Sequence, residues 1–414
     1  MSKSVELFER ARRLIPAASQ TMSKSYDRFV QGVTPTLVES GKGAYLKATD
    51  GKWYLDFGMG LGAAILGYSH PVVNEAIEKQ LRQGTLFSLP ATLEGEVAEE
   101  LLRWVPWAEQ VRFGKNGTDV TTAAVRLARA YTKRDKVVVI RGHYHGWGDW
   151  FIGALQPGLG IPDPVKAQII MVEPSIDALD ALSWKDIAAV ILEPIPANAV
   201  ELDLSFLSTL RHITQKAGAL LIFDEVFCGF RYRMGSAQPL IHPDLACFGK
   251  ALSNGMPLSA VVGKREIMKL LEPGRVFFSG TAGGECLSLA AALATMRYMA
   301  RKHIPFQLEK AGITLRDAFN ELVGDSDVAK CTGLGPRTVV SFKDKAYKDL
   351  FQQVCAENCV LFIGAHNMSE AHTDREILAV MDVYEEALDV VRCAETPENA
   401  ARLLKGPASV VAYR

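Results

Sequence analysis

Short runs of apolar residues recur through the middle of the chain, separated by longer stretches of helical or irregular character. Six of these runs have the length and aliphatic content of buried strands: residues 136–140, 168–172, 188–192, 219–223, 245–248 and 259–262. From Val120 to Tyr131, apolar residues recur at helical spacing instead. This alternation predicts an α/β fold with a mostly parallel sheet and helices on both faces.

The two ends of the chain have a different pattern. A charged amphipathic helix is expected at residues 1–13, and a helix at 289–301 leads out of the central part. Beyond it, helices mix with short strands such as 338–342 and 360–363. We therefore predict a large domain, with a smaller α+β domain formed by both chain ends. The expected boundaries are 61–301 for the large domain, and 1–60 with 302–414 for the smaller one.

Composition narrows the class of protein. With 414 residues, of which 48% are hydrophobic, the chain can bury a large core, and a net charge of −1 gives no reason to expect a nucleic-acid or membrane partner. No run approaches the roughly 18 apolar residues of a membrane helix, and the amino terminus lacks an apolar signal core. The seven cysteines lie mostly in apolar surroundings and are odd in number, which indicates reduced thiols and a cytoplasmic location. Their spacing does not predict a metal site.

Lys250 is the best candidate for a reactive amine. It follows the apolar run 245–248 and precedes the turn Asn254-Gly255, where lost hydration would favour the neutral amine that forms an imine with a carbonyl. Taken alone, it could be a surface lysine. Asp224, however, ends another buried run, and a carboxylate there needs a cation. The protonated pyridine of pyridoxal phosphate, with a lysine imine on its aldehyde, explains both residues. A metal ligand or a helix cap would explain Asp224 alone.

A second segment is suited to a phosphate. Residues 111–119 are expected to form a loop that opens the helix beginning near Val120. Gly117 permits close backbone approach, Thr118 can donate a hydrogen bond, and the helix start attracts an anion. Ordinary helix caps look the same. The segment 142–147, Gly-His-Tyr-His-Gly-Trp, could place a ring against the pyridine, but it could also be a packed loop or a His-x-His metal pair.

Several blocks together resemble one family. In chain order they are Gly43-Ala-Tyr45, Asp50 to Phe57, Leu66-Gly-Tyr-Ser-His-Pro71, Asn116-Gly-Thr118, Tyr144-His145-Gly146, Glu193-Pro194, Asp224-Glu-Val226, Gly229-Phe-Arg231, Lys250 and Ser279-Gly-Thr281. The chain resembles the class III, fold-type I pyridoxal-phosphate aminotransferases, in the branch of glutamate-1-semialdehyde aminomutase. The resemblance runs from about Gly43 to about Ala387.

The resemblance implies roles for individual residues. Lys250 would form the imine and transfer the proton, and Asp224 would hold the pyridine nitrogen. Val226 would pack behind the ring and Tyr144 on its front, while Gly117 and Thr118 would bind the phosphate. Thr281 would reach the phosphate of the neighbouring subunit's cofactor, which implies a homodimer. The remaining cofactor-binding candidates are Asn116, His145, Glu193 and Asn198.

The substrate is less well defined. Aminomutase relatives carry Val-Asn-Ser-Pro-Val-Arg near the start, where this chain has Ser19 to Gly32, and the segment 364–373 also departs from the family pattern. His366 and Asn367 in that segment are either pocket residues or part of a packed polar loop. We expect an aminotransferase that moves an amino group from glutamate to a ketone or aldehyde acceptor, such as a sugar or nucleotide-linked intermediate. The alternative is an intramolecular 2,1-aminomutase.

Other classes of protein fit less well. A racemase or decarboxylase would use the same cofactor, and a catalytically silent scaffold would not need Lys250, Asp224 and the phosphate loop together. Gly58-x-Gly60-x-x-Ala63 matches a dinucleotide-binding motif. No buried strand precedes it and no helix-then-acid pattern follows, so we do not expect a nicotinamide or flavin enzyme.

Overall fold

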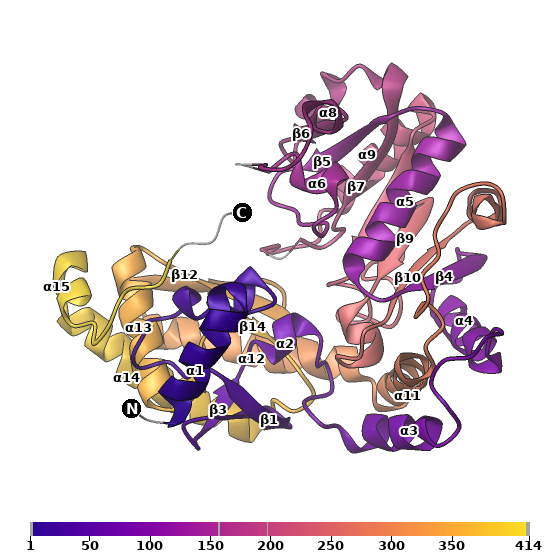
Figure 1. Cartoon of the computed structure of the whole chain (residues 1–414). Helices are drawn as coiled ribbons and strands as arrows, with labels where there is room; N and C mark the ends of the chain where they lie inside the picture. Colours follow the sequence, from indigo (N-terminus) through magenta and orange to yellow (C-terminus); the bar gives the residue numbers. More distant parts are fainter. Residues whose placement is uncertain (1–2, 156–157, 197, 411–414) are drawn as a thin grey trace. The chain divides into compact units, whose positions relative to one another are not determined.

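The computed structural model describes residues 3–155, 158–196 and 198–410. The described residues form two compact units. Of the described residues, the large unit holds 71–306 and the small unit holds those up to 70 and from 307 to 410. Figure 1 colours the chain along its sequence, so the small unit combines the early and the late colours of the bar.

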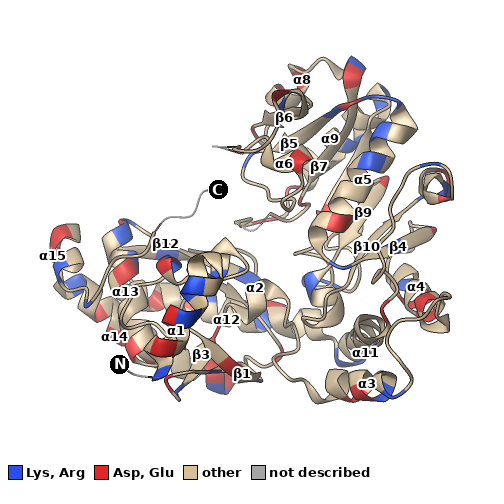
Figure 2. Ribbon diagram, in the orientation of Figure 1, with Lys and Arg blue, Asp and Glu red and all other residues tan. Residues whose placement is uncertain are grey.

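A seven-stranded sheet forms the centre of the large unit. Its strands, in spatial order, are β4 (Gln110–Gly114), β10 (Ser259–Gly263), β9 (Leu245–Phe248), β8 (Leu220–Glu225), β7 (Ile187–Leu192), β5 (Lys136–Ile140) and β6 (Ile169–Val172). Neighbouring strands are parallel except at β10, which is antiparallel to both β4 and β9. Strands β7, β9 and β10 carry no charged residue (Figure 2), as expected for strands covered on both faces. The expected mostly parallel α/β sheet is confirmed.

The edge strand β4 was not expected. Residues 110–114 pair with β10 from Gln110 opposite Gly263 to Gly114 opposite Ser259, so the loop expected at 111–119 shrinks to Lys115 and Asn116. The expectation failed because an edge strand is only partly buried. Arg112 is exposed and Val111 only half-buried, and such a segment lacks the apolar run that identifies the central strands.

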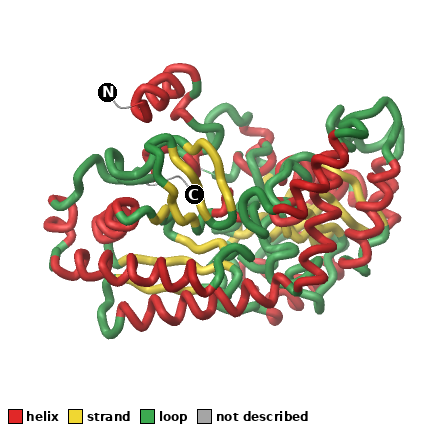
Figure 3. The backbone as a smooth tube through the Cα atoms, turned by 90° about the horizontal axis from the view of Figure 1, so that it is seen from below, coloured by secondary structure: helices red, strands yellow, loops and turns green. Residues whose placement is uncertain are grey.

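Helices pack on both sides of this sheet (Figure 3). The helices of the large unit are α3 (Pro71–Leu81), α4 (Thr92–Trp104), α5 (Gly117–Thr132), α6 (Asp149–Ile152), α7 (Asp163–Lys166), α8 (Ile176–Asp180), α9 (Leu204–Ala217), α10 (Arg265–Met268) and α11 (Cys286–Lys302), with 3-10 turns η4 (Trp184–Asp186), η5 (Lys250–Ser253) and η6 (Lys269–Leu271). Helix α5 packs on the central strands through Val120, Ala124 and Leu127, all fully buried. Helix α11 packs against α3, α4 and η5, which supports the backbone around Lys250.

The small unit contains two sheets. One has the order β1 (Val38–Lys42), β2 (Tyr45–Ala48), β3 (Trp53–Asp56) and β13 (Val360–Leu361), and the other β11 (Ala329–Thr332), β12 (Arg337–Phe342) and β14 (Ala365–Asn367). Its helical segments are α1 (Lys3–Leu14), η1 (Pro16–Ala18), η2 (Met22–Lys24), η3 (Tyr26–Arg28), α2 (Met59–Gly62), α13 (Lys345–Glu357), α14 (Asp374–Cys393), α15 (Pro397–Arg402) and most of α12 (Ile304–Val323). Phe351 lies at the centre of its core, with the rings of Phe362 and Tyr384 at centroid distances of 5.0 and 5.1 Å.

The glycine-rich stretch after β3 is a left-handed turn. Met59, Gly60, Leu61 and Gly62 all have positive φ, at 45°, 59°, 61° and 82°. Residues other than glycine are strained in this region, and Asp56 compensates by accepting hydrogen bonds from the backbone N–H groups of Gly58 and Met59 at 2.6 and 2.9 Å. A dinucleotide motif requires a right-handed helix start at this position, so the geometry explains why the motif match is misleading.

No helix within the described residues is long and apolar enough to cross a membrane.

Candidate active site

The chemically important side chains predicted for the large unit follow the carboxyl ends of its parallel strands. Asp224 is the second-to-last residue of β8, and Lys250 follows β9. Tyr144 and His145 follow β5, and Glu193 follows β7. Because these parallel strands end at the same edge of the sheet, residues far apart in sequence come together there. The start of α5 joins them, since β4 also ends at this edge.

Asp224 and His145 form a buried pair. His145 Nδ1 lies 2.8 Å from Asp224 Oδ2, and the two residues are 1% and 3% exposed. The other carboxylate oxygen, Oδ1, accepts the backbone N–H of Val226 at 3.0 Å. Nε2 of His145 is buried and has no hydrogen-bond partner within the described residues. Such a pair fixes the direction of the carboxylate.

Neighbouring residues hold this loop in place. His143 Nδ1 accepts the backbone N–H of Glu193 at 2.9 Å, and Glu193 Oε2 accepts the N–H of Tyr144 at 3.4 Å. Burial, followed by the proximity of His145, lowers the pKa of His143 to about 4, so its ring is neutral at pH 7. Burial, followed by the charge of Asp224, raises the pKa of the Tyr144 phenol. The Tyr144 side chain is 58% exposed in the single chain.

Val226, whose backbone N–H binds Asp224, also packs against two glycines of the site, Gly117 and Gly249. A Cβ built on Gly117 would lie 3.0 Å from Val226 Cγ1, and one built on Gly249 would lie 3.2 Å from the same atom. Both distances are tighter than ordinary packing contacts, so neither position has room for a larger residue without movement. Val226 therefore lies between the start of α5 and the residue before Lys250.

The backbone of Lys250 is strained. Its φ is +40°, an uncommon value for a lysine and one that costs of the order of 1–3 kcal/mol. Its amine lies 5.1 Å from the centre of the Phe227 ring, and Phe227 is 7% exposed. Strain of this kind is concentrated at functional positions because the surrounding structure must enforce it.

The start of α5 has its own capping arrangement. The Asn116 side chain accepts the N–H of Asp119 at 3.2 Å, and Asp119 Oδ2 accepts the N–H groups of Lys115 and Asn116 at 2.8 and 3.1 Å. Ser259 Oγ also donates to the carbonyl of Asn116 at 2.8 Å. Asn116 is thus committed to capping, whereas Gly117 and Thr118 are the first helical residues, whose N–H groups have no acceptor within a helix. These two N–H groups are suited to an anion.

The aromatic loop closes on this helix start. Thr118 Oγ1 accepts the N–H of Trp147 at 3.2 Å. A Cβ on Gly146 would lie 2.4 Å from that same oxygen, so only glycine allows the approach. His143 and His145 use their Nδ1 atoms for Glu193 and Asp224, and the described residues contain no group of three or more His, Cys, Asp or Glu side chains that could hold a metal ion.

Two predicted residues lie apart from this cluster of contacts. Asn198 is exposed in a turn after β7, and Thr281 is exposed in the turn before α11. Exposure of Thr281 in a single chain is compatible with a role toward a second subunit.

Several supporting residues were missed from the sequence. Lys115 Nζ lies 3.0 Å from Glu285 Oε2 and 3.3 Å from Ser288 Oγ, which ties the loop before α5 to the start of α11. Glu225 is fully buried next to Asp224, and burial raises its pKa to about 8. The Asp-Glu pair at the end of an apolar strand could have drawn attention to Glu225. Lys115 and Glu285 are 170 residues apart and give no local signal.

In the small unit, His366 is a structural residue. Its Nδ1 lies 2.7 Å from Thr338 Oγ1 and its Nε2 2.8 Å from the Tyr384 hydroxyl. Burial, followed by His372, lowers its pKa to about 3. Asn367 donates through Nδ2 to the Gly58 carbonyl at 2.9 Å. For His366, these contacts support the packed polar loop rather than a residue of the substrate pocket.

Together, these groups fit pyridoxal phosphate. A buried carboxylate braced by a histidine suits a pyridinium, and the free N–H groups of a helix start suit a phosphate. A lysine next to an apolar ring can lose hydration and become nucleophilic.

Comparison with known proteins identifies the class. The profile of the family Aminotransferase class-III matches residues 28–373, so the chain belongs to the class III aminotransferases and is a pyridoxal-phosphate-dependent enzyme. Relatives include glutamate-1-semialdehyde 2,1-aminomutases from Chloroherpeton thalassium, 37% identical over 84% of this chain and 85% of the relative, and from Methanothermobacter thermautotrophicus, 37% identical over 79% and 80%.

Solved structures agree on the fold. An omega-transaminase from Sphaerobacter thermophilus matches with a TM-score of 0.86 and 28% identity over 94% of this chain and 98% of that one. A glutamate-1-semialdehyde aminomutase from Pseudomonas aeruginosa matches with a TM-score of 0.82 and 23% identity over 94% of each chain. The expected fold-type I architecture is confirmed.

Proposed function

We propose that this enzyme catalyses an intramolecular 2,1-aminomutase reaction, moving an amino group between adjacent carbons of an amino aldehyde such as glutamate-1-semialdehyde. The named activity of relatives at 37% identity over most of the chain supports this reaction. It was the alternative expected from the sequence, and the relatives favour it over transfer to a sugar-linked acceptor.

In this proposal, the large unit binds the cofactor through the residues described above. Asp224, held by His145, binds the pyridine nitrogen, and the N–H groups of Gly117 and Thr118 bind the phosphate. Val226 supports one face of the ring and Tyr144 covers the other. When bound, pyridoxal phosphate supplies an electron sink for the charge that develops on the substrate carbon.

Lys250 is the acid and base in this mechanism. Its amine removes a proton from one substrate carbon and returns a proton at the neighbouring position. The hydrogen bond between Asp224 and His145 holds the carboxylate in a fixed position, which keeps the site complementary to the charge of the transition state. The observation that carries the proposal is this buried pair at the end of β8, with the strained Lys250 at the end of the adjacent strand β9.

The remaining cofactor candidates have supporting roles. Glu193 orders the loop of Tyr144, and Asn116 caps α5. Thr281 reaches the phosphate bound by a second subunit in a homodimer, and Asn198, in an exposed turn after β7, contacts the cofactor. All seven cysteines are free, consistent with action in the cytoplasm.

One observation favours a second candidate, transfer of an amino group from glutamate to a separate carbonyl acceptor. The segment Ser19 to Gly32 lacks the aminomutase pattern Val-Asn-Ser-Pro-Val-Arg. In this chain it forms the short turns η2 and η3, so its contacts with a substrate carboxylate need not match those of the relatives.

Two incubations separate these reactions. With glutamate-1-semialdehyde, the aminomutase yields 5-amino-4-oxopentanoate and releases no 2-oxoglutarate. With glutamate alone, the intermolecular enzyme releases one 2-oxoglutarate per active site, and Lys250→Ala abolishes either outcome. Release of 2-oxoglutarate without isomerisation would replace the aminomutase with the second candidate, and failure of both reactions would contradict both.

A further inference from the structure

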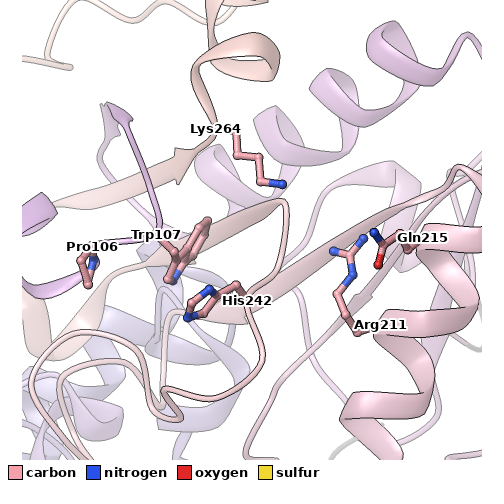
Figure 4. Close-up of a pocket in the computed structure, with 6 residues that line it drawn as sticks. All are labelled: Pro106, Trp107, Arg211, Gln215, His242 and Lys264. Atoms are coloured by element: carbon pink, nitrogen blue, oxygen red, sulfur yellow. The ribbon is translucent and has the colours of Figure 1, made fainter.

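The large unit also has a cavity at the other edge of its sheet. Six residues line this cavity of about 590 Å³: Pro106, Trp107, Arg211, Gln215, His242 and Lys264 (Figure 4). They come from the loop between α4 and β4, from α9, from the loop before β9 and from the end of β10. Since β10 is antiparallel to β9, its end lies beside the start of β9. The cavity therefore lies at the amino ends of the parallel strands, away from Lys250 and Asp224.

Two rings form one side of this cavity. The rings of Trp107 and His242 are nearly parallel, at 22°, with centroids 6.3 Å apart. His242 Nε2 lies 3.2 Å from the Pro239 carbonyl, a contact that holds the imidazole ring in place. Ring faces of this kind bind planar heteroaromatic groups by stacking.

Two cations form the other side. In Figure 4 Arg211 and Gln215 project from α9 across from the rings, and the Lys264 amine is directed toward the space between them. Arg211 Nη1 lies 2.8 Å and Lys264 Nζ 4.0 Å from the carboxylate of Asp244. Asp244 also accepts the backbone N–H of Leu221 at 2.8 Å, so a single structural carboxylate faces two cations.

The residues that line the cavity include two cations, Lys264 and Arg211, and no carboxylate. Glu109, in the same region, accepts the backbone N–H of Arg265 at 2.7 Å through Oε2 and so caps the start of α10. The planar guanidinium of Arg211 can bind a phosphate or carboxylate through the N–H groups not used by Asp244.

We propose that this cavity is a second binding site, specific for a planar aromatic anion: a heteroaromatic ring carrying a phosphate or carboxylate, as in a nucleoside monophosphate. Its volume lies within the range of roughly 300–1,000 Å³ of small-molecule sites. The ring stacks on Trp107 and His242, the Gln215 amide contacts its polar edge, and the anion binds Lys264 and Arg211. The cavity and Lys250 lie at opposite ends of β9, so the ligand does not compete with substrate.

Calorimetric titration of the pyridoxal-phosphate-saturated enzyme tests the site with four probes: AMP, nicotinate, adenosine and inorganic phosphate. We expect AMP or nicotinate to bind in the micromolar to millimolar range. Adenosine, which lacks the anionic group, and phosphate, which lacks the aromatic ring, should bind at least about tenfold more weakly. The visible absorbance of the cofactor should stay unchanged, which excludes binding at the catalytic site.

Two charge-reversal variants localise the binding. Lys264→Glu should weaken binding at least about fivefold, whereas Lys269→Glu, which makes the same charge change at an exposed lysine of η6 outside the cavity, should leave it unchanged. Gln215→Glu, an isosteric change at an exposed position, should also weaken it. Absence of binding by both AMP and nicotinate would overturn the proposal. So would equal binding of adenosine or phosphate, or binding that Lys264→Glu does not weaken.

Discussion

His145 Nδ1 lies 2.8 Å from Asp224 Oδ2, and both residues are almost completely buried. The two residues are 79 positions apart and meet because β5 and β8 end at the same edge of one sheet. The pair gives the carboxylate a fixed direction and a partner that shares its charge, which is what a pyridinium-binding acid requires.

Removal of that partner should reduce activity strongly. His145→Ala deletes a hydrogen bond to a charged group, an interaction of about 1.5–3 kcal/mol, equivalent to roughly 10- to 150-fold in kcat/KM. The visible spectrum of the bound cofactor should also change its dependence on pH, because Asp224 holds the pyridine proton less firmly. The same substitution at exposed His212 should change neither quantity. An unaltered spectrum and rate in His145→Ala would remove the pair from the mechanism.

A larger residue at Gly117 should weaken cofactor binding, because Gly117 packs closely against Val226. Gly117→Ala places a methyl group 3.0 Å from Val226 Cγ1, and the resulting strain of about 1–3 kcal/mol should raise the dissociation constant of pyridoxal phosphate about 5- to 150-fold. Val226→Ala in the same chain should restore part of the affinity. Gly95→Ala in α4, where a Cβ meets nothing within 4 Å, serves as the control. Equal effects of the two glycine substitutions would contradict the account.

The Lys115–Glu285 ion pair should matter for the same binding loop. Its side chains are 21% and 19% exposed, so Lys115→Met leaves a partly buried carboxylate unpaired, and we expect about 1–2 kcal/mol weaker cofactor binding. Lys136→Met breaks a 3.9 Å pair with Asp186 whose side chains are 41% and 63% exposed, and it should cost less than about 0.5 kcal/mol. The release of the cofactor from each variant, followed by its absorbance, measures both effects. Equal weakening in Lys115→Met and Lys136→Met would show that the Lys115–Glu285 pair does not support the loop.

Buried histidines of the small unit should make stability depend on pH. Burial lowers the pKa of His366 to about 3 and of His372 to about 4, below the value of about 6.5 in an unfolded chain. The unfolded state therefore binds more protons between pH 6.5 and 4. Stability is fully present above about pH 6.5 and falls as the pH decreases, by up to about 1.4 kcal/mol per unit for each histidine.

Thermal unfolding between pH 7 and 4.5 measures this dependence. His366→Gln should have a shallower decrease in Tm toward low pH than the unmodified protein, whatever its absolute stability. His303→Gln, at an exposed position, should keep the original slope. Parallel profiles for all three proteins would show that His366 does not carry the linkage.

Local patterns in the sequence were sufficient for part of this structure. The runs 136–140 and 245–248 are exactly β5 and β9, and the apolar run before Asp224 placed that carboxylate at a strand end, because a fully buried strand has an unmistakable composition. Strand β4 was missed since it is a partly exposed edge. The Asp224–His145 and Lys115–Glu285 contacts depend on which strands are neighbours in the sheet, and no local pattern specifies that.

The chemistry depends most directly on the covalent bond between Lys250 and the cofactor aldehyde. Borohydride reduction of the enzyme incubated with pyridoxal phosphate, followed by peptide mass spectrometry, locates that bond. The account predicts a single phosphopyridoxyl group on Lys250 and loss of the visible absorbance band, with neither signal in Lys250→Ala. A phosphopyridoxyl group on another lysine, or an unchanged visible band in Lys250→Ala, would contradict it.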